Sequence, residues 1–336
     1  MSVRHLIASA SLAFIAGLSA TSAQAYSQLV VFGDSLSDDG NAYSALQSLS
    51  STLKLPGAPY YDGRFTNGQV AAEVMAQSLG IGLDDRAYGG ALTGTGNQFT
   101  ATSVFASVMA NTGMASQVSG YITEKGGALD ASALYMVWGG GNDFLSVLAS
   151  NDSALITAAA TAAITNIVGE VKSLYAAGAR EFFVPDLADF SFTIYGATAD
   201  EATRQRLSAM TQRFNQAVQS YLGAFDQAAT DASVHFFDTN AALTTLRSEI
   251  AANGGTLGSS CWTGSYLGAV GSSGATLCSD PDTYFLFDKV HPTAIVHETL
   301  GNAFAASVSA VPEPSTMGLA LVGLLGVAVV GRRRAA

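Results

Sequence analysis

A serine, an aspartate and a histidine in this sequence could form a nucleophilic site. A serine hydroxyl attacks a carbonyl carbon once a base removes its proton, and histidine suits that task because its pKa lies near neutrality. Ser35 follows a short apolar run, and Asp288 precedes His291 by three residues. One turn would bring that carboxylate to the imidazole, where it would fix the tautomer. Alone, the pair also fits a helix-capping aspartate beside an unrelated histidine.

The other three histidines of the chain fit simpler roles. His5 lies in an N-terminal leader that we expect to be removed. His235 lies in an apolar run and is expected in the core. His297 lies in a predicted helix over residues 293–306 and is expected to be structural. His291 is therefore the base that we expect to act on Ser35.

Strand and helix patterns alternate along the chain and must position these residues. Short apolar runs predict buried strands at residues 29–32, 83–87, 134–138, 181–184 and 234–237. Helices are predicted over residues 69–79, 153–177 and 199–228. This alternation predicts an α/β fold, a three-layer α/β/α sandwich with about five parallel strands. Ligands bind beyond the carboxyl ends of such strands, and Ser35 comes soon after the first one.

Two stretches break the alternation. Residues 89–127 are rich in Gly, Thr, Ser and Asn, and residues 253–282 are rich in Gly and Ser. Both are predicted surface loops that either shape substrate access or connect elements passively. The second contains Cys261 and Cys278, which we expect to form a disulfide in an exported chain, the alternative being two free thiols. Neither cysteine has metal-ligand spacing, so no metal is expected.

Five short segments match the motifs of one hydrolase family, in that family's order. They read FGDSLSDDGN at 32–41, YYDGRFTNG at 60–68, AYGGA at 87–91, GGND at 140–143 and DKVH at 288–291. Across residues 28–306 the chain resembles the SGNH, or GDSL-type, esterase/lipase family. It departs from the family pattern at Asp85, where the family usually has asparagine. Asp34 and Asp143, within two of these segments, are expected to stabilise turns.

The resemblance implies a flavodoxin-like sandwich and hydrolysis of carboxylic esters through an acyl-serine intermediate, without a cofactor. It makes Ser35, Asp288 and His291 the catalytic residues. It assigns the transition-state oxyanion to the backbone N–H groups of Ser35 and Gly90 and to the side-chain amide of Asn142. Family members cleave short acyl esters, lipids and acetyl groups on polysaccharide, and the sequence selects none of these. Two alternative functions are a catalytically idle, surface-retained binding module with the same fold and a carbohydrate acetylesterase that acts on extracellular polysaccharide.

Both ends of the chain have the pattern of sorting segments. In residues 1–25 a basic flank, an apolar stretch and an Ala-x-Ala ending predict a signal peptide that signal peptidase removes. Residues 311–336 contain Pro-Glu-Pro, an apolar stretch at 316–331 and three arginines, and they resemble the PEP-CTERM sorting tag, which an exosortase processes. The hydrolase domain is therefore expected to span residues 26–310.

The apolar stretch at 316–331 is short for a permanent membrane span, so it predicts transient membrane association with the arginines kept on the cytoplasmic side. We expect an exported bacterial protein in the periplasm, at the cell surface or in the extracellular matrix. Without leader and tag the chain keeps 11 basic and 25 acidic residues, a net charge of −14, which disfavours nucleic acid as a partner.

Missing motifs exclude further functions. The sequence around Ser35 lacks the G-x-S-x-G elbow, which disfavours the α/β-hydrolase fold. The aspartates at 34, 38 and 39 lack the ligand spacing of a calcium loop. The chain contains neither a Walker loop nor a dinucleotide-binding fingerprint.

Overall fold

Five parallel strands form the central sheet. They are β1 (Gln28–Gly33), β2 (Gly82–Asp85), β3 (Leu134–Trp138), β4 (Glu181–Pro185) and β5 (Ser233–Phe237), in the spatial order β2-β1-β3-β4-β5. The register is continuous across the centre, where Leu29 of β1 pairs with Leu134 of β3 and Leu134 pairs with Glu181 of β4. The predicted α/β class and its five parallel strands are confirmed, with bounds within two residues of those expected.

The structure is a computed structural model that describes residues 26–100, 103–148, 152–268 and 272–309. Residues 26–307 form one compact unit. The predicted signal peptide at 1–25 and the predicted sorting segment at 311–336 lie outside the described residues.

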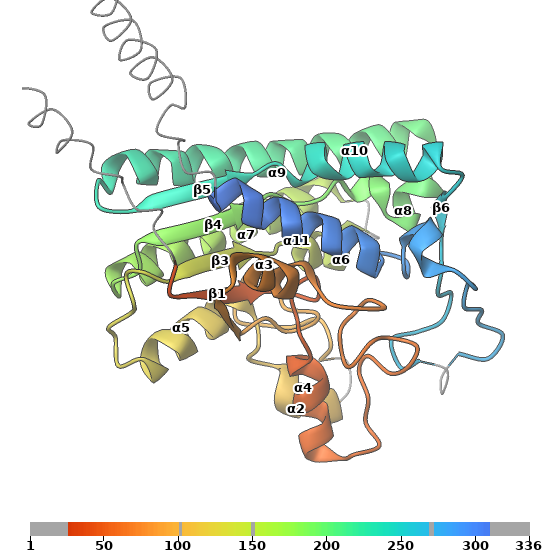
Figure 1. Cartoon of the computed structure of the whole chain (residues 1–336), viewed down its shortest axis with the longest axis horizontal. Helices are drawn as coiled ribbons and strands as arrows, with labels where there is room; N and C mark the ends of the chain where they lie inside the picture. Colours follow the sequence, from red (N-terminus) through yellow and green to blue (C-terminus); the bar gives the residue numbers. More distant parts are fainter. Residues whose placement is uncertain (1–25, 101–102, 149–151, 269–271, 310–336) are drawn as a thin grey trace, which may run out of the picture. The chain divides into compact units, whose positions relative to one another are not determined.

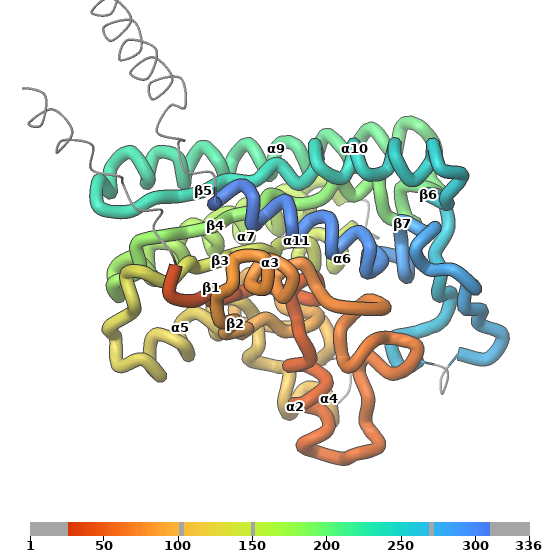
Figure 2. The backbone as a smooth tube through the Cα atoms, viewed as in Figure 1, coloured from red at the N-terminus to blue at the C-terminus, as the bar shows by residue number. Residues whose placement is uncertain are grey.

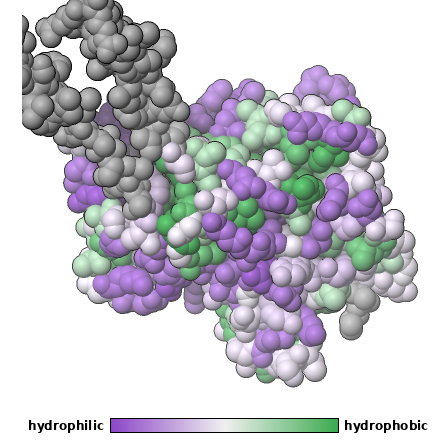
Figure 3. All heavy atoms as spheres, viewed as in Figure 1, coloured by the Kyte–Doolittle hydropathy of each residue, from purple (hydrophilic) through white to green (hydrophobic). Residues whose placement is uncertain are grey.

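Helices cover both faces of the sheet (Figure 1). α3 (Ala71–Leu79) and α11 (Ala294–Ser309) lie on one face, and α5 (Met114–Glu124), α7 (Ser153–Ala176) and α9 (Glu201–Ala228) lie on the other. The remaining helices are α2 (Asn41–Leu49), α4 (Ser103–Met109), α6 (Gly141–Leu148), α8 (Ile194–Ala197) and α10 (Thr239–Ala252), with short 3₁₀ turns at Phe190–Phe192 and Pro281–Thr283. The α3 and α11 side mixes hydrophilic and hydrophobic residues on its surface (Figure 3).

Alternate side chains of the strands supply the cores on the two faces, as the period of a strand requires. One set packs against α5, α7 and α9 and consists of Val30, Phe32, Tyr135, Val137, Phe182 and Val184. On the opposite face, the rings of Trp138 and Phe183 lie 5.5 and 5.1 Å from the ring of Phe304 in α11. Because both faces are buried, the central strands read as continuous apolar runs.

The strand order reverses at β1, and this reversal places the site. From β1 the chain passes through α2 and α3 to β2 on one side, and then through α4 and α5 to β3 on the other. Right-handed crossovers in opposite directions put α3 and α5 on opposite faces, which leaves a crevice at the carboxyl ends of β1 and β3. Ser35 follows β1 by two residues and Asn142 follows β3 by four, so both lie at this crevice.

Two predicted loops contain regular structure. The stretch 89–127 contains α4 and α5, because its small polar residues are interspersed with Val, Phe and Met side chains that pack inward. The stretch 253–282 contains β6 (Thr256–Ser260), which pairs in parallel with β7 (Tyr284–Leu286) in a small second sheet. Figure 2 shows these two strands next to each other. The Gly- and Ser-rich composition of β6 gave no strand signal.

Candidate active site

A chain of hydrogen bonds links Ser35, His291 and Asp288. Oγ of Ser35 lies 2.7 Å from Nε2 of His291, and Nδ1 of His291 lies 2.8 Å from Oδ2 of Asp288. All three side chains are buried. The structure thus brings together the three residues that the sequence proposed as a nucleophile, a base and an orienting carboxylate, although Ser35 and His291 are 256 positions apart.

The carboxylate of Asp288 also stabilises the turn that carries His291. Its Oδ1 accepts hydrogen bonds from the backbone N–H groups of Val290 and His291, at 2.9 and 2.8 Å. Burial opposes ionisation of this carboxyl, but the charge and hydrogen bonds of His291 outweigh it and lower the pKa of Asp288. An ionised Asp288 holds the proton of the neutral imidazole on Nδ1, which leaves Nε2 free to accept the proton of Ser35.

Tyr60 is a fourth member of this network that the residue patterns did not single out. Its hydroxyl donates a hydrogen bond of 2.8 Å to Oδ2 of Asp288. Tyr60 is buried, and its ring packs edge-on against Phe287 at 5.1 Å. Burial and the charge of Asp288 raise the pKa of Tyr60, so its hydroxyl stays a donor. Its place in the segment 60–68 gave the only hint of a role.

Two aromatic rings flank the imidazole of His291. The rings of Phe65 and Tyr266 lie 5.3 and 5.6 Å from it. Tyr266 comes from the predicted surface loop at 253–282, so this loop shapes the site. Cys261 and Cys278 of the same stretch are joined in a disulfide, with their Cα atoms 4.7 Å apart.

Three hydrogen-bond donors were predicted to bind an oxyanion. Among the described residues, the backbone N–H groups of Ser35 and Gly90 donate to no protein acceptor, which leaves both available to a ligand. Asn142 is the second residue of α6 and donates one amide hydrogen to the carbonyl of Ala91 at 2.9 Å. Its other amide hydrogen has no acceptor among the described residues. Gly90 has φ of 78°, and a Cβ there would meet the ring of Phe99 at 2.5 Å, so glycine is required.

The carboxylate of Asp38 ties the serine loop to the loop that carries Gly90. It accepts backbone N–H groups from Gly40, Asn41 and Ala42 on one side and from Gly89 on the other. Burial raises the pKa of Asp38 to about 6, and these four hydrogen bonds oppose that rise. The two loops that surround the predicted oxyanion position are therefore joined through one side chain.

Other acidic residues of the motifs support the backbone. Asp34 stabilises its turn as predicted, because Oδ1 accepts the N–H of Leu36 at 3.1 Å. Asp143 instead accepts the backbone N–H and hydroxyl of Thr93, 50 positions away. Asp85, the departure from the family motif, accepts the N–H groups of Ala87 and Asp39, so its loop is held by the carboxylate. Burial and the charge of Asp39 raise the pKa of Asp85.

His297 and His235 were both predicted to have structural roles inside the protein, and the structure places only His297 there. His297 is buried in α11, and its Nδ1 accepts the backbone N–H of Ala71 at 3.2 Å, at the start of α3. Burial, with the nearby His291, lowers the pKa of His297 to about 3, so it stays neutral. The prediction that His235 lies in the core is wrong. It lies on the edge strand β5, its side chain is 34% exposed, and its Nε2 is 3.2 Å from a carboxylate oxygen of Glu181.

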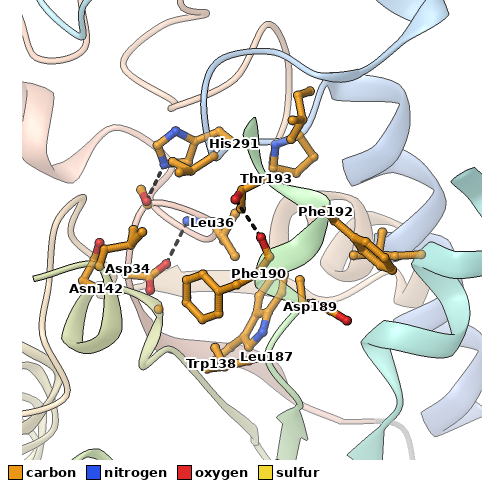
Figure 4. Close-up of a pocket in the computed structure, with 18 of the residues that line it drawn as sticks. Asp34, Leu36, Trp138, Asn142, Leu187, Asp189, Phe190, Phe192, Thr193 and His291 are labelled. Carbon is orange, nitrogen blue, oxygen red and sulfur yellow. Dashed lines mark hydrogen bonds between the residues drawn. The ribbon is translucent and has the colours of Figure 1, made fainter. Parts of the chain in front are cut away.

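A largely apolar pocket of about 100 Å³ opens next to Ser35 and His291. Figure 4 shows Asp34 and Asn142 on the side of His291, with Leu187, Phe190 and Trp138 lower in the pocket and Phe192 beyond them. Along the described ranges, no group of three His, Cys, Asp or Glu side chains is placed to hold a metal ion. The pocket therefore combines a hydroxyl that is hydrogen-bonded to an imidazole with walls suited to hydrocarbon.

The family model described as GDSL-like Lipase/Acylhydrolase matches residues 29–304. The chain belongs to this family. The model of the PEP-CTERM protein-sorting motif matches residues 310–334. Both predicted resemblances are confirmed. The PEP-CTERM motif indicates export and a C-terminal sorting tag, and it implies processing by an exosortase.

Relatives of this GDSL-family chain include "Lipase 1" of Photorhabdus luminescens, 33% identical over 176 residues, which are 52% of this chain and 24% of that protein. The thermolabile hemolysin of Vibrio parahaemolyticus is 28% identical over 233 residues, 66% of this chain and 47% of that protein. The chain thus spans less than half the length of these two relatives. A solved alpha/beta hydrolase enzyme from the metagenome of Lake Arreo is 12% identical, with a TM-score of 0.46 over 84% of this chain and 94% of that one.

Proposed function

We propose that this protein hydrolyses carboxylic esters through an acyl intermediate on Ser35. The observation that carries the proposal is the unbroken hydrogen-bond chain from Ser35 through His291 to Asp288, with contacts of 2.7 and 2.8 Å. These are the contacts a serine needs to become a nucleophile at neutral pH. Membership of a family described as lipases and acylhydrolases supports the same reaction.

In the first step, Oγ of Ser35 attacks the carbonyl carbon of the ester while its proton moves to Nε2 of His291. The carbonyl oxygen becomes an oxyanion, which accepts hydrogen bonds from the N–H groups of Ser35 and Gly90 and from the amide of Asn142. The C–O bond to the alcohol then breaks, and the imidazolium of His291 donates its proton to the departing alcohol oxygen. The acyl group remains on Ser35.

In the second step, water replaces the alcohol. Nε2 of His291 takes a proton from the water, whose oxygen attacks the acyl carbon, and the same donors stabilise the second oxyanion. The bond to Oγ breaks, Ser35 recovers its proton from His291, and the carboxylic acid leaves. Ionised Asp288 stabilises the imidazolium in both steps.

The site of action is proposed to lie outside the cytoplasm. A signal peptide at residues 1–25 would direct export, and the C-terminal tag would hold the chain in the membrane through 316–331 until an exosortase acts on it. The enzyme would then work in the periplasm, at the cell surface or in the extracellular matrix. An excess of acidic over basic residues suits a water-soluble secreted enzyme.

A fluorophosphonate probe tests the proposal, because it reacts with activated serines. The purified protein should be labelled on Ser35 and should hydrolyse p-nitrophenyl esters, whereas Ser35→Ala should lose labelling and on the order of 10⁴-fold in rate. Absence of labelling in the folded wild-type protein would favour the idle binding module. Chain-length series of p-nitrophenyl esters, acetylated glycans and phospholipids would then define the acyl group and the alcohol.

A further inference from the structure

A second hollow, of about 1040 Å³, lies between α7 and α9 beside the active-site pocket. We call it the α7/α9 groove. Five residues line both the groove and the active-site pocket, namely Gln98, Phe99, Leu145, Tyr266 and Val290. The groove therefore borders the active-site pocket along these five side chains, and a ligand that spans both hollows would have one end in front of Ser35.

Part of the boundary between the groove and the pocket lies on the side of His291, while Phe99 and Leu145 lie near Gly90 and Asn142. Val290 is the neighbour of His291 in the chain, and the ring of Tyr266 lies 5.6 Å from the imidazole. In the proposed reaction, His291 protonates the departing alcohol, so the alcohol part of the ester must lie on that side of the scissile bond. The groove is consequently placed to hold the alcohol part of the substrate.

The floor of the groove is apolar. It is formed by side chains that pack against the main core but remain partly exposed, among them Leu148, Ile156, Ala160, Ile164 and Met210. By length and composition α7 is apolar enough to cross a membrane, with a mean hydropathy of 1.5, although only 28% of that stretch is buried here. An uncovered apolar surface of this kind suits a hydrocarbon chain.

Two arginines border this apolar floor. Arg206 and Arg213 lie seven residues apart on α9, so they share one face of the helix with a rise of about 10.5 Å between them. No aspartate or glutamate lines the groove in the described part of the chain, in a protein with 26 acidic and 15 basic residues.

These two arginines form no ion pair among the described residues. Of the other described arginines, Arg64, Arg86, Arg180 and Arg204 each contact a carboxylate. Arg247 also lacks a carboxylate partner, and its guanidinium lies over the rings of Phe192 and Phe285 instead. Arg206 donates a hydrogen bond to the hydroxyl of Thr203 and interacts electrostatically with the carboxylate of the exposed Asp200. Within the described ranges Arg213 has neither a hydrogen bond nor an ion pair. The guanidinium of Arg213, and the donors of Arg206 that do not bind Thr203, are thus available to an anion.

We propose that the α7/α9 groove binds the alcohol part of an anionic lipid ester, with its hydrocarbon chain on the apolar floor and its phosphate group on Arg206 and Arg213. This inference rests on the proposed ester hydrolysis and specifies its substrate class. Guanidinium groups bind phosphate oxygens through paired, charge-assisted hydrogen bonds, which gives them preference over a neutral headgroup. A neutral ester with a small alcohol would use neither arginine.

Binding can be measured apart from catalysis in the Ser35→Ala variant. Calorimetry below the micellar concentration should show dodecyl phosphate binding at least tenfold more tightly than dodecyl maltoside. The double variant Arg206→Gln/Arg213→Gln should lose that preference. The matched control Lys172→Gln/Arg204→Gln removes two charges from α7 and α9 outside the groove and should keep it.

Three results would overturn the inference. The first is equal binding of the two amphiphiles, and the second is an equal loss of affinity in both double variants, which would indicate general charge attraction. The third is displacement of dodecyl phosphate by the same concentration of inorganic phosphate, which would show that the hydrocarbon chain contributes nothing.

Kinetics complete the test. Two substrates with the same acyl chains are compared, the anionic phosphatidylglycerol and a neutral diacylglycerol. The Arg206→Gln/Arg213→Gln variant should lose at least tenfold more kcat/KM on phosphatidylglycerol than on the diacylglycerol. An equal loss on both lipids would contradict the inference. If the wild-type protein hydrolyses no ester at all, the proposed function fails, whereas the binding preference for dodecyl phosphate still decides whether the groove recognises anionic lipid.

Discussion

The hydroxyl of Tyr60 and the imidazole of His291 bind the same oxygen, Oδ2 of Asp288, each at 2.8 Å. Oδ1 of the same carboxylate accepts two backbone hydrogen bonds, from Val290 and His291. Each oxygen of this buried carboxylate therefore accepts two hydrogen bonds, which uses its acceptor capacity. Tyr60 therefore limits rotation of the carboxylate and is a positioning residue, since it contacts Asp288 rather than the reacting atoms.

Replacement of Tyr60 by phenylalanine should lower kcat by about fivefold and leave KM within about twofold, because a lost hydrogen bond of about 1 kcal/mol loosens the orienting carboxylate without altering the pocket. The measurement is steady-state kinetics with a p-nitrophenyl ester. Tyr61→Phe, at an exposed neighbouring position, is the control and should match the wild type. An unchanged kcat in Tyr60→Phe would show that the hydroxyl serves stability alone.

Asn142→Ala should reduce kcat by about 10²–10³-fold, the usual loss for one oxyanion donor. KM should change little, because the hydrogen bond strengthens as negative charge develops on the carbonyl oxygen. The control is Asn166→Ala, which removes a partly buried amide that binds the hydroxyl of Thr93 in the adjoining network. If both variants lose activity equally, the effect of Asn142 comes from the fold of this network.

We expect the buried carboxyl of Glu170 to make the free energy of unfolding depend on pH. It is buried in α7, neither carboxylate oxygen has a hydrogen-bond partner among the described residues, and burial together with the charge of Asp143 raises its pKa well above the usual value. Because the folded state holds this proton more tightly than the unfolded state, the free energy of unfolding falls as pH rises above the ordinary glutamate pKa of about 4.3.

Glu170→Gln removes that dependence. Relative to the wild type, it should gain about 1–3 kcal/mol in free energy of unfolding at pH 8 and much less at pH 5. Urea unfolding at both pH values measures the difference. Glu249→Gln, at an exposed position of α10, should show no such change. A gain in Glu170→Gln that is equal at both pH values would contradict the titration of Glu170.

Loss of the disulfide should affect both stability and rate. Cys261→Ala/Cys278→Ala opens a loop of 17 residues and should lower the free energy of unfolding by about 3 kcal/mol. Cys261 belongs to the cluster that holds Tyr60 and Phe287, so kcat should fall as well. A reductant should reproduce both effects in the wild type and add nothing to the double variant. Equal stability of reduced and oxidised wild type would rule this out.

The sequence predicted what is encoded locally. The apolar run before Ser35 and the three-residue spacing of Asp288 and His291 gave a strand end and a turn, and both are present. The hydrogen bond between Tyr60 and Asp288 joins positions 228 apart, and no local pattern encodes such a pairing. β6 was not predicted because its Gly and Ser residues have a low strand propensity. It forms a strand through its pairing with β7, which is a tertiary contact.

The shared carboxylate of Asp38 has a consequence for protein engineering. Because it binds the backbone N–H groups of Gly40, Asn41 and Ala42 together with that of Gly89, it fixes the loop of the proposed nucleophile relative to the loop of the predicted oxyanion donor. If only one of the two loops were replaced by that of a homologue, the new loop would lack the matching partner for the hydrogen bonds of Asp38. A transplant that keeps the geometry must therefore exchange residues 34–42 and 85–91 as a unit, whereas the walls of the pocket can be varied one side chain at a time.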